Sequence, residues 1–317
     1  MTSRRLRLAA TATLAAAAAT ASCDAPQEFL SLGTAGTGGI YYPLGGAMAA
    51  RMSLNDPLRQ YTAEVSGGSV ENVNRLRARQ TDLAFATGNT VFEAATGGQD
   101  YAEAVENLRI LAPLYPNMTA ILVSRGSTAT SVSDLAGARV SVGAAGSGTE
   151  QMSRQILEAY GFSYDDVRPQ FLTFNESATA LKDGAIDAAI ISVGYPAAAV
   201  LEATTTGGAR LLAMEPDRIQ FLRERYPYFI TGEIPGGIYP GADEPLETAA
   251  IMNWVVGMAD LPEQVVDGVL GLLTDDREAL AQVHEMVDQI DMARLREAPI
   301  RLHPITQSWV DLNLEQQ

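Results

Sequence analysis

Two glycine-rich loops, residues 33–39 (GTAGTGG) and 143–150 (GAAGSGTE), each stand between an apolar run and a segment with helical spacing. Backbone N–H groups at a strand-to-helix junction are left unpaired by the helix and carry its positive dipole end, so they suit a carboxylate or phosphate. The first loop is not a dinucleotide fingerprint, because Tyr41 replaces its last glycine, and no Gly-Lys pair marks a phosphate-binding loop. The pair predicts two loops that face each other across a cleft.

Strand-like and helix-like segments alternate along most of the chain, which predicts an α/β fold with mostly parallel sheets. Residues 108–123 form a long apolar stretch that contains Pro116. This stretch suits a strand that passes from one lobe into another better than a surface hairpin. We expect lobe I to comprise residues 28–123 and 222–317, and lobe II residues 124–221.

Composition excludes several classes of function. The 317 residues include 22 basic and 38 acidic ones, a net charge of −16, which argues against a nucleic-acid-binding surface. Lys182 is the only lysine, so no polybasic membrane patch exists. One cysteine and two histidines, His284 and His303, leave little for a metal site, and we expect neither a metal nor a cofactor.

The first 22 residues have three arginines, then an Ala/Leu/Thr run without acidic residues, which predicts a secretory signal and a location outside the cytoplasm. Its removal leaves 19 basic and 38 acidic residues, near −19. Cys23, the only cysteine, follows small residues as in a bacterial lipobox, so we expect lipidation. Ordinary cleavage after Ala21 is the alternative.

Three further features are open to a functional or a structural interpretation. Ser147 is a candidate hydrolase nucleophile, but Ala145 breaks the G-x-S-x-G elbow and no histidine lies in these loops. The turn at 66–69 is explained most simply by helix capping through Ser69. Four tyrosines next to Gly or Pro fit a pocket wall and a structural support equally well: Tyr41, Tyr42, Tyr115 and Tyr195.

Taken together, successive motifs resemble the TAXI family, the solute receptors of tripartite ATP-independent periplasmic (TRAP) transporters. They are GTGGIYYPLGGAMA (36–49), VSGGSVENVNRL (65–76), TDLAFATGNTVFEAATG (81–97), VGAAGSGTE (142–150), LKDGAIDAAIISVGYP (181–196) and IPGGIYPGADE (234–244). The resemblance implies a type II periplasmic-binding-protein fold, two α/β lobes with a hinge and a ligand cleft. It also implies a small carboxylate ligand, such as glutamate, glutamine or a 2-oxoglutarate-like diacid, delivered to permease subunits driven by an ion gradient.

The family motifs also imply the residues of the binding site. These are Thr37, Gly38, Gly39, Tyr41, Asn89 and Thr90 on one side, and Gly146, Ser147, Gly148, Thr149 and Tyr195 on the other. We add Tyr115 to the predicted site because its ring stands beside Pro116. The loops among them contain no Arg or Lys, so helix N-termini, hydroxyls and glycine amides would hold an anion. The alternatives are a receptor of this fold for an ATP-driven importer, a sensory receptor, and a secreted serine hydrolase.

Overall fold

The computed structural model describes residues 27–98 and 100–314 of the chain. The predicted signal at 1–22 and the lipidation site Cys23 lie outside these residues. The described part forms one mixed α/β structure around a continuous ten-stranded sheet, in which eight strands follow the order β2-β1-β3-β10-β4-β7-β5-β6. Strand β8 adds to β4, and β9 adds to β10.

The strands are long in the middle of the sheet and short in its lower part. They are β1 (Glu28–Gly33), β2 (Arg59–Glu64), β3 (Leu83–Thr87), β4 (Leu108–Val123), β5 (Arg139–Ser141), β6 (Arg168–Gln170), β7 (Ala188–Val193), β8 (Arg210–Leu212), β9 (Phe229–Ile234) and β10 (Leu246–Met258). The strand expected at 108–123 is confirmed at both ends.

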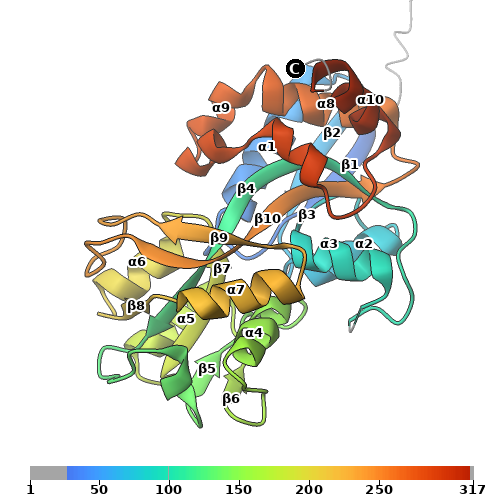
Figure 1. Ribbon diagram of the computed structural model, residues 1–317. Helices are drawn as coiled ribbons and strands as arrows, with labels where there is room; N and C mark the ends of the chain where they lie inside the picture. Colours follow the sequence, from blue (N-terminus) through green and yellow to red (C-terminus); the bar gives the residue numbers. More distant parts are fainter. Residues whose placement is uncertain (1–26, 99, 315–317) are drawn as a thin grey trace, which may run out of the picture.

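The helices cover the sheet in two groups (Figure 1). The upper part of the molecule carries α1 (Tyr41–Asn55), α2 (Ser69–Arg77), α3 (Gly88–Thr96), α8 (Glu263–Thr274), α9 (Arg277–Ala281) and α10 (Pro304–Asn313) beside β1–β3. The lower part carries α4 (Gly148–Ala159), α5 (Phe174–Lys182), α6 (Ala198–Thr205) and α7 (Pro216–Arg225) beside β5–β9. Short 3₁₀ turns occur at Val132–Leu135, Glu285–Gln289 and Met292–Glu297.

The expected α/β class is confirmed, but the prediction of mostly parallel sheets is wrong. Parallel pairing is confined to the outer strands, where β1 joins β2 and β3 and where β5 joins β6 and β7. The middle strands β4 and β10 are antiparallel to each other and to their neighbours. Hydrophobic runs indicate a buried strand without indicating its direction, which depends on where the rest of the chain has placed its partners.

Strands β4 and β10 run from the upper part into the lower part and pair along most of their length (Figure 1). Their register shifts between Met252 and Trp254 and again between Val255 and Val256. Such bulges bend and twist a strand pair. The division into two mobile lobes at residues 123 and 222 stays a prediction.

Capping residues set the start of two helices in the lower part. Helices α4 and α5 begin at Gly148 and Phe174, directly after Ser147 and Thr173, whose hydroxyls cap them. Helix α7 and strand β9 were not expected. Strand β9 pairs only with β10 among the described strands, so long-range pairing stabilises a segment whose glycine-rich surroundings indicate a loop.

Candidate functional site

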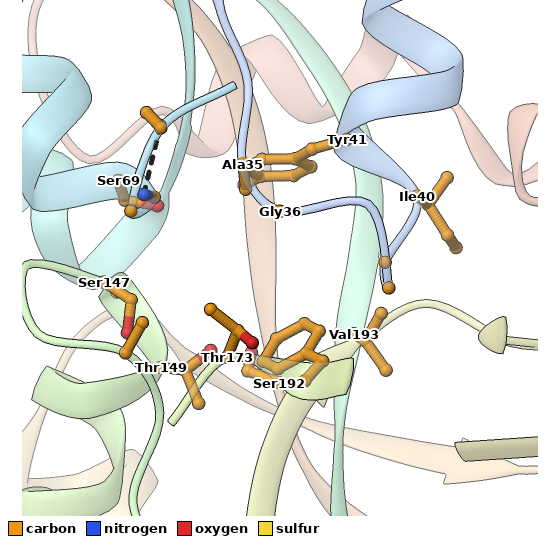
Figure 2. Close-up of a pocket in the computed structure, with 18 of the residues that line it drawn as sticks. Ala35, Gly36, Ile40, Tyr41, Ser69, Ser147, Thr149, Thr173, Ser192 and Val193 are labelled. Atoms are coloured by element: carbon orange, nitrogen blue, oxygen red, sulfur yellow. Dashed lines mark hydrogen bonds between the residues drawn. The ribbon is translucent and has the colours of Figure 1, made fainter. Parts of the chain in front are cut away.

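A cavity of about 240 Å³ lies between the upper and lower parts of the molecule. Figure 2 shows its two walls, with Ala35, Tyr41 and Ser69 above and Ser147, Thr149 and Thr173 below. Strands β1 and β2 end at the upper wall, and the helices that follow them, α1 and α2, begin there. Parallel strands bring these loops together, because their carboxyl ends share one edge of the sheet.

Among residues 27–98 and 100–314, those that line the cavity are all uncharged, with no Asp, Glu, Lys, Arg or His. Helices α1, α2, α4 and α5 all begin at this wall, so four positive dipole ends point toward the same space. Small residues bring the backbone close to the cavity, including Gly36, Gly38, Gly39, Gly67, Gly68 and Gly148. An anion can be held here by N–H groups and hydroxyls without a cation.

The four helix N-termini are not equivalent. Helices α4 and α5 are capped by Ser147 and Thr173, and the first turns of α2, α4 and α5 contain Glu71, Glu150 and Glu176. Helix α1 has neither a side-chain cap nor an acidic residue in its first turn. Its N–H groups are therefore the most available to a ligand, and its dipole end is the least offset by carboxylates.

Two glycines of the first loop lie close to the first residues of α5. A Cβ at Gly38 would lie 2.3 Å from Oδ1 of Asn175, and one at Gly39 would lie 3.3 Å from the Phe174 ring. Asn175 also donates a side-chain hydrogen bond to the Thr37 hydroxyl at 3.2 Å. The loop before α1 and the start of α5 therefore meet at one end of the cavity.

A buried hydrogen-bond network supports the other side. Asn253 Nδ2 donates to the Tyr115 carbonyl and to Asn117 Oδ1, both at 2.8 Å, and Asn117 Nδ2 donates to the Ser192 carbonyl at 3.1 Å. Tyr115, Asn117 and Ser192 line the cavity. The Ser192 hydroxyl is buried and has no hydrogen-bond partner among the described residues, so it is available to a ligand group at this wall.

The structure brings most of the predicted site residues together. Those that line the cavity are Thr37, Gly38, Gly39, Tyr41, Tyr115, Ser147, Gly148 and Thr149. Four are not among the residues that line it, and their part in ligand binding stays a prediction: Asn89, Thr90, Gly146 and Tyr195. The Tyr195 hydroxyl accepts a hydrogen bond from Gln289 Nε2 at 2.6 Å. The other three lie behind the wall, where they join the two parts of the molecule.

Sequence reasoning missed several lining residues. The turn at 66–69 lines the cavity, and the simple capping interpretation of Ser69 is wrong, because Gly68 is the N-cap and Ser69 Oγ accepts from the Thr87 N–H at 3.1 Å. Thr173, Phe174 and Asn175 were also missed. The capping box formed by Thr173 and Glu176 was a usable signal for a helix start there.

The geometry around Ser147 does not resemble a hydrolase site. Its hydroxyl accepts a hydrogen bond from the Glu150 N–H at 3.1 Å, as a helix cap does. The His284 ring lies 3.0 Å from the Pro196 carbonyl oxygen, and His303 is buried and caps α10. Neither histidine lines the cavity.

No three His, Cys, Asp or Glu side chains in residues 27–98 and 100–314 are grouped so that they could hold a metal ion. None of the helices that the structure describes combines the length and apolar character needed to cross a membrane.

Residues 32–308 match the model of the NMT1-like family. The fold resembles that of PhnD1 from Prochlorococcus marinus, solved with methylphosphonate (TM-score 0.56, 12% identity, 90% of this chain and 96% of that chain covered). It also resembles the periplasmic binding protein BugD (TM-score 0.55, 13% identity, 92% of this chain and 95% of that chain covered). A third similar structure is the alkanesulfonate-binding protein SsuA from Xanthomonas axonopodis pv. citri, bound to MOPS (TM-score 0.50, 19% identity, 91% of this chain and 93% of that chain covered). These structural similarities show that the chain has the fold of periplasmic binding proteins.

Proposed function

The chain belongs to the NMT1-like family, and from this premise we propose that it is an extracytoplasmic receptor for a small organic anion. The observation that carries the proposal is the uncharged cavity at which four helices begin. Hydroxyl and amide groups from both parts of the molecule surround this cavity, so one ligand would contact both. A ligand that contacts both parts stabilises the arrangement in which they are close.

The proposed ligand is a small carboxylate, such as glutamate, glutamine or 2-oxoglutarate, and the proposed partner is a TRAP permease. Support comes from the resemblance of the loop motifs to TAXI receptors and from the N–H-lined cavity. Seven of the eleven residues implied by that resemblance line one cavity, among them Thr37, Tyr41 and Ser147. The proposed location is the periplasm, with Cys23 as a lipid anchor.

A second candidate ligand class is an organic sulfonate or phosphonate, delivered to an ATP-driven importer. The observation in its favour is that two proteins of similar fold were solved with MOPS and with methylphosphonate. Tetrahedral oxyanions, like carboxylates, bind at helix N-termini through backbone N–H groups. The cavity chemistry therefore suits both classes.

A ligand panel tests the proposal and separates the two classes. Glutamate, 2-oxoglutarate, methylphosphonate and ethanesulfonate are added to the mature protein, and unfolding temperature and calorimetric heat are measured. An anion at about 100 times its Kd stabilises the folded state by about 2.7 kcal/mol. The dimethyl esters of 2-oxoglutarate and methylphosphonate, which carry no charge, serve as controls. Failure of every anion to stabilise the protein would contradict the proposal.

Further measurements address the partner and the anchor. Uptake of the identified ligand by whole cells should stop with an ionophore if a TRAP permease is the partner, and with ATP depletion if an ATP-driven importer is. A sensory role predicts no uptake at all.

Labelling with a fatty-acid analogue that is lost in Cys23→Ser would establish the lipid anchor. Turnover of an ester substrate that is lost in Ser147→Ala would favour a hydrolase instead.

A further inference from the structure

We propose that Asn89, Thr90 and Gly148 form a clasp that holds the upper and lower parts together beside the cavity. The clasp joins the N-terminus of α4 to the first turn of α3, and Asn89 and Thr90 are positioning residues that do not line the cavity. Asn89 Nδ2 donates to the Gly148 carbonyl at 3.1 Å, and the Thr90 hydroxyl donates to Oε1 of Gln151. Its effect on ligand binding rests on the function proposed above.

The surfaces of the clasp fit closely enough that only glycine is accommodated at position 148. A Cβ there would lie 2.1 Å from Oγ1 of Thr87 and 3.0 Å from both Ser69 Oγ and Thr90 Oγ1. These three hydroxyls form one cluster, with 3.2 Å separating Thr87 Oγ1 from each of the other two oxygens. The backbone of α4 therefore rests directly on a hydroxyl surface of the upper part.

A second contact flanks this one. The N–H of Glu71 donates to the Gly146 carbonyl at 3.0 Å, and a Cβ at Gly68 would lie 3.2 Å from the Cβ of Ser147. Gly68 has a φ of +125°, which excludes most other residues on conformational grounds as well. The backbones of the upper and lower parts therefore approach each other at glycines, Gly68 in the upper part and Gly148 in the lower part.

The clasp shares its residues with the cavity. Ser147 and Thr149 flank Gly148 and line the cavity, as do Ser69 and Thr87 on the opposing surface. A change in the clasp therefore changes the distance between the two walls that would hold a ligand.

The clasp is suited to opening as well as to closing. Oδ1 of Asn89 is buried without a hydrogen-bond partner among the described residues, so the contact does not satisfy every polar group that it buries. Opening would hydrate this oxygen. The upper and lower parts are also joined by β4 and β10, the two long strands that run from one part into the other.

Gly148→Ala in the full mature chain tests the clasp, with Gly271→Ala as the matched control. Gly271 is also a helical glycine, but a Cβ there meets nothing within 4 Å. Spin labels on cysteines placed at the exposed Glu103 and Asp165, in a Cys23→Ser background, report the separation of the two parts. We expect Gly148→Ala to shift the label distances upward, and Gly271→Ala to leave them unchanged.

Thr90→Val provides a second test if Gly148→Ala does not fold, because valine retains the shape of threonine and removes the bond to Gln151. We expect a broadened distance distribution. With whichever of 2-oxoglutarate and methylphosphonate binds the wild type, we also expect dissociation faster by about tenfold or more, with little change in association. Wild-type distances in the folded variants would overturn the clasp. If neither compound binds the wild type, the distances still decide the clasp, and only the proposed function fails.

Discussion

The hydroxyl of Tyr41 donates a hydrogen bond to Oδ1 of Asn253, 212 residues further along the chain, at 2.5 Å. Tyr41 is the first residue of α1 and lines the cavity, whereas Asn253 lies in β10 where its register with β4 shifts. Burial raises the pKa of the Tyr41 hydroxyl, so it remains a donor throughout the physiological range. The ring therefore forms part of the wall, while the hydroxyl ties α1 to the middle of the sheet.

This bond predicts that Tyr41→Phe affects stability more than ligand binding. The substitution leaves Asn253 Oδ1 buried without this donor, so we expect unfolding in urea to become easier by about 1–3 kcal/mol. The affinity for an identified anion should change less than threefold. Tyr42→Phe, at a more exposed neighbouring ring, is the control and should alter neither quantity. A large loss of affinity with unchanged stability would show that the hydroxyl serves the ligand instead.

The double variant Ser147→Ala, Thr149→Ala tests the lower wall of the cavity. A hydrogen bond to a charged group contributes about 1.5–3 kcal/mol, so we expect affinity for the anion to fall about tenfold or more in calorimetry. Loss of the Ser147 cap should also lower stability by about 1 kcal/mol. Ser131→Ala removes a helix cap outside the cavity and should lower stability alone. Equal affinity of the double variant and the wild type would remove these hydroxyls from the site.

Glu71→Gln is expected to strengthen anion binding. The Glu71 carboxylate accepts a hydrogen bond from the N–H of Gly67, a residue of the cavity wall, at 2.8 Å. Its charge opposes an anion at the N-terminus of α2, and removing it should raise affinity about two- to fivefold at low ionic strength. Titration at several salt concentrations measures the effect, with the exposed Glu103→Gln as control. Weaker binding by Glu71→Gln would indicate that the carboxylate contacts a positive group of the ligand.

Glu93 predicts a pH dependence of stability. Burial of this side chain raises the pKa of its carboxyl above the ordinary 4.5. A carboxyl whose pKa is higher in the folded than in the unfolded protein binds its proton more tightly in the folded state. It therefore stabilises the folded state fully below the unfolded-state pKa, and this stabilisation is lost as the pH rises through the folded-state pKa. We therefore expect Glu93→Gln to melt at a higher temperature than the wild type at pH 7.5 and at a similar temperature at pH 3.5.

Gln155 Nε2 donates to Glu93 Oε1 at 2.9 Å, and a glutamine carbonyl at position 93 can accept the same bond. The same carbonyl can accept the bond from the Tyr228 hydroxyl, at 3.3 Å from Oε1. The variant therefore removes the charge of Glu93 together with one long hydrogen bond, from Gln151 Nε2 to Oε2 at 3.4 Å. Glu103→Gln, at an exposed site, should leave the melting temperature unchanged at both pH values. A destabilised Glu93→Gln at pH 7.5 would show that the charged form is the favoured one.

The sequence by itself determined the α/β class, most of the strand and helix positions, and two of the loops at the cavity. Local signals carry this information: apolar runs mark buried strands, and glycines before amphipathic segments mark helix starts. The strand at 108–123 and the loops containing Gly38 and Ser147 were found in this way, because each depends mainly on its own residues.

Only the tertiary structure decided which strands run antiparallel, that the loop at 173–175 lines the cavity, and that Asn89 and Thr90 contact α4 rather than the cavity. Each of these facts depends on the distance between residues far apart in the chain. The same buried Asn or Thr is compatible with a ligand contact and with a contact between helices. Packing of α4 against α3 produces the second, because it brings the Gly148 carbonyl to Asn89 and the Gln151 side chain to Thr90.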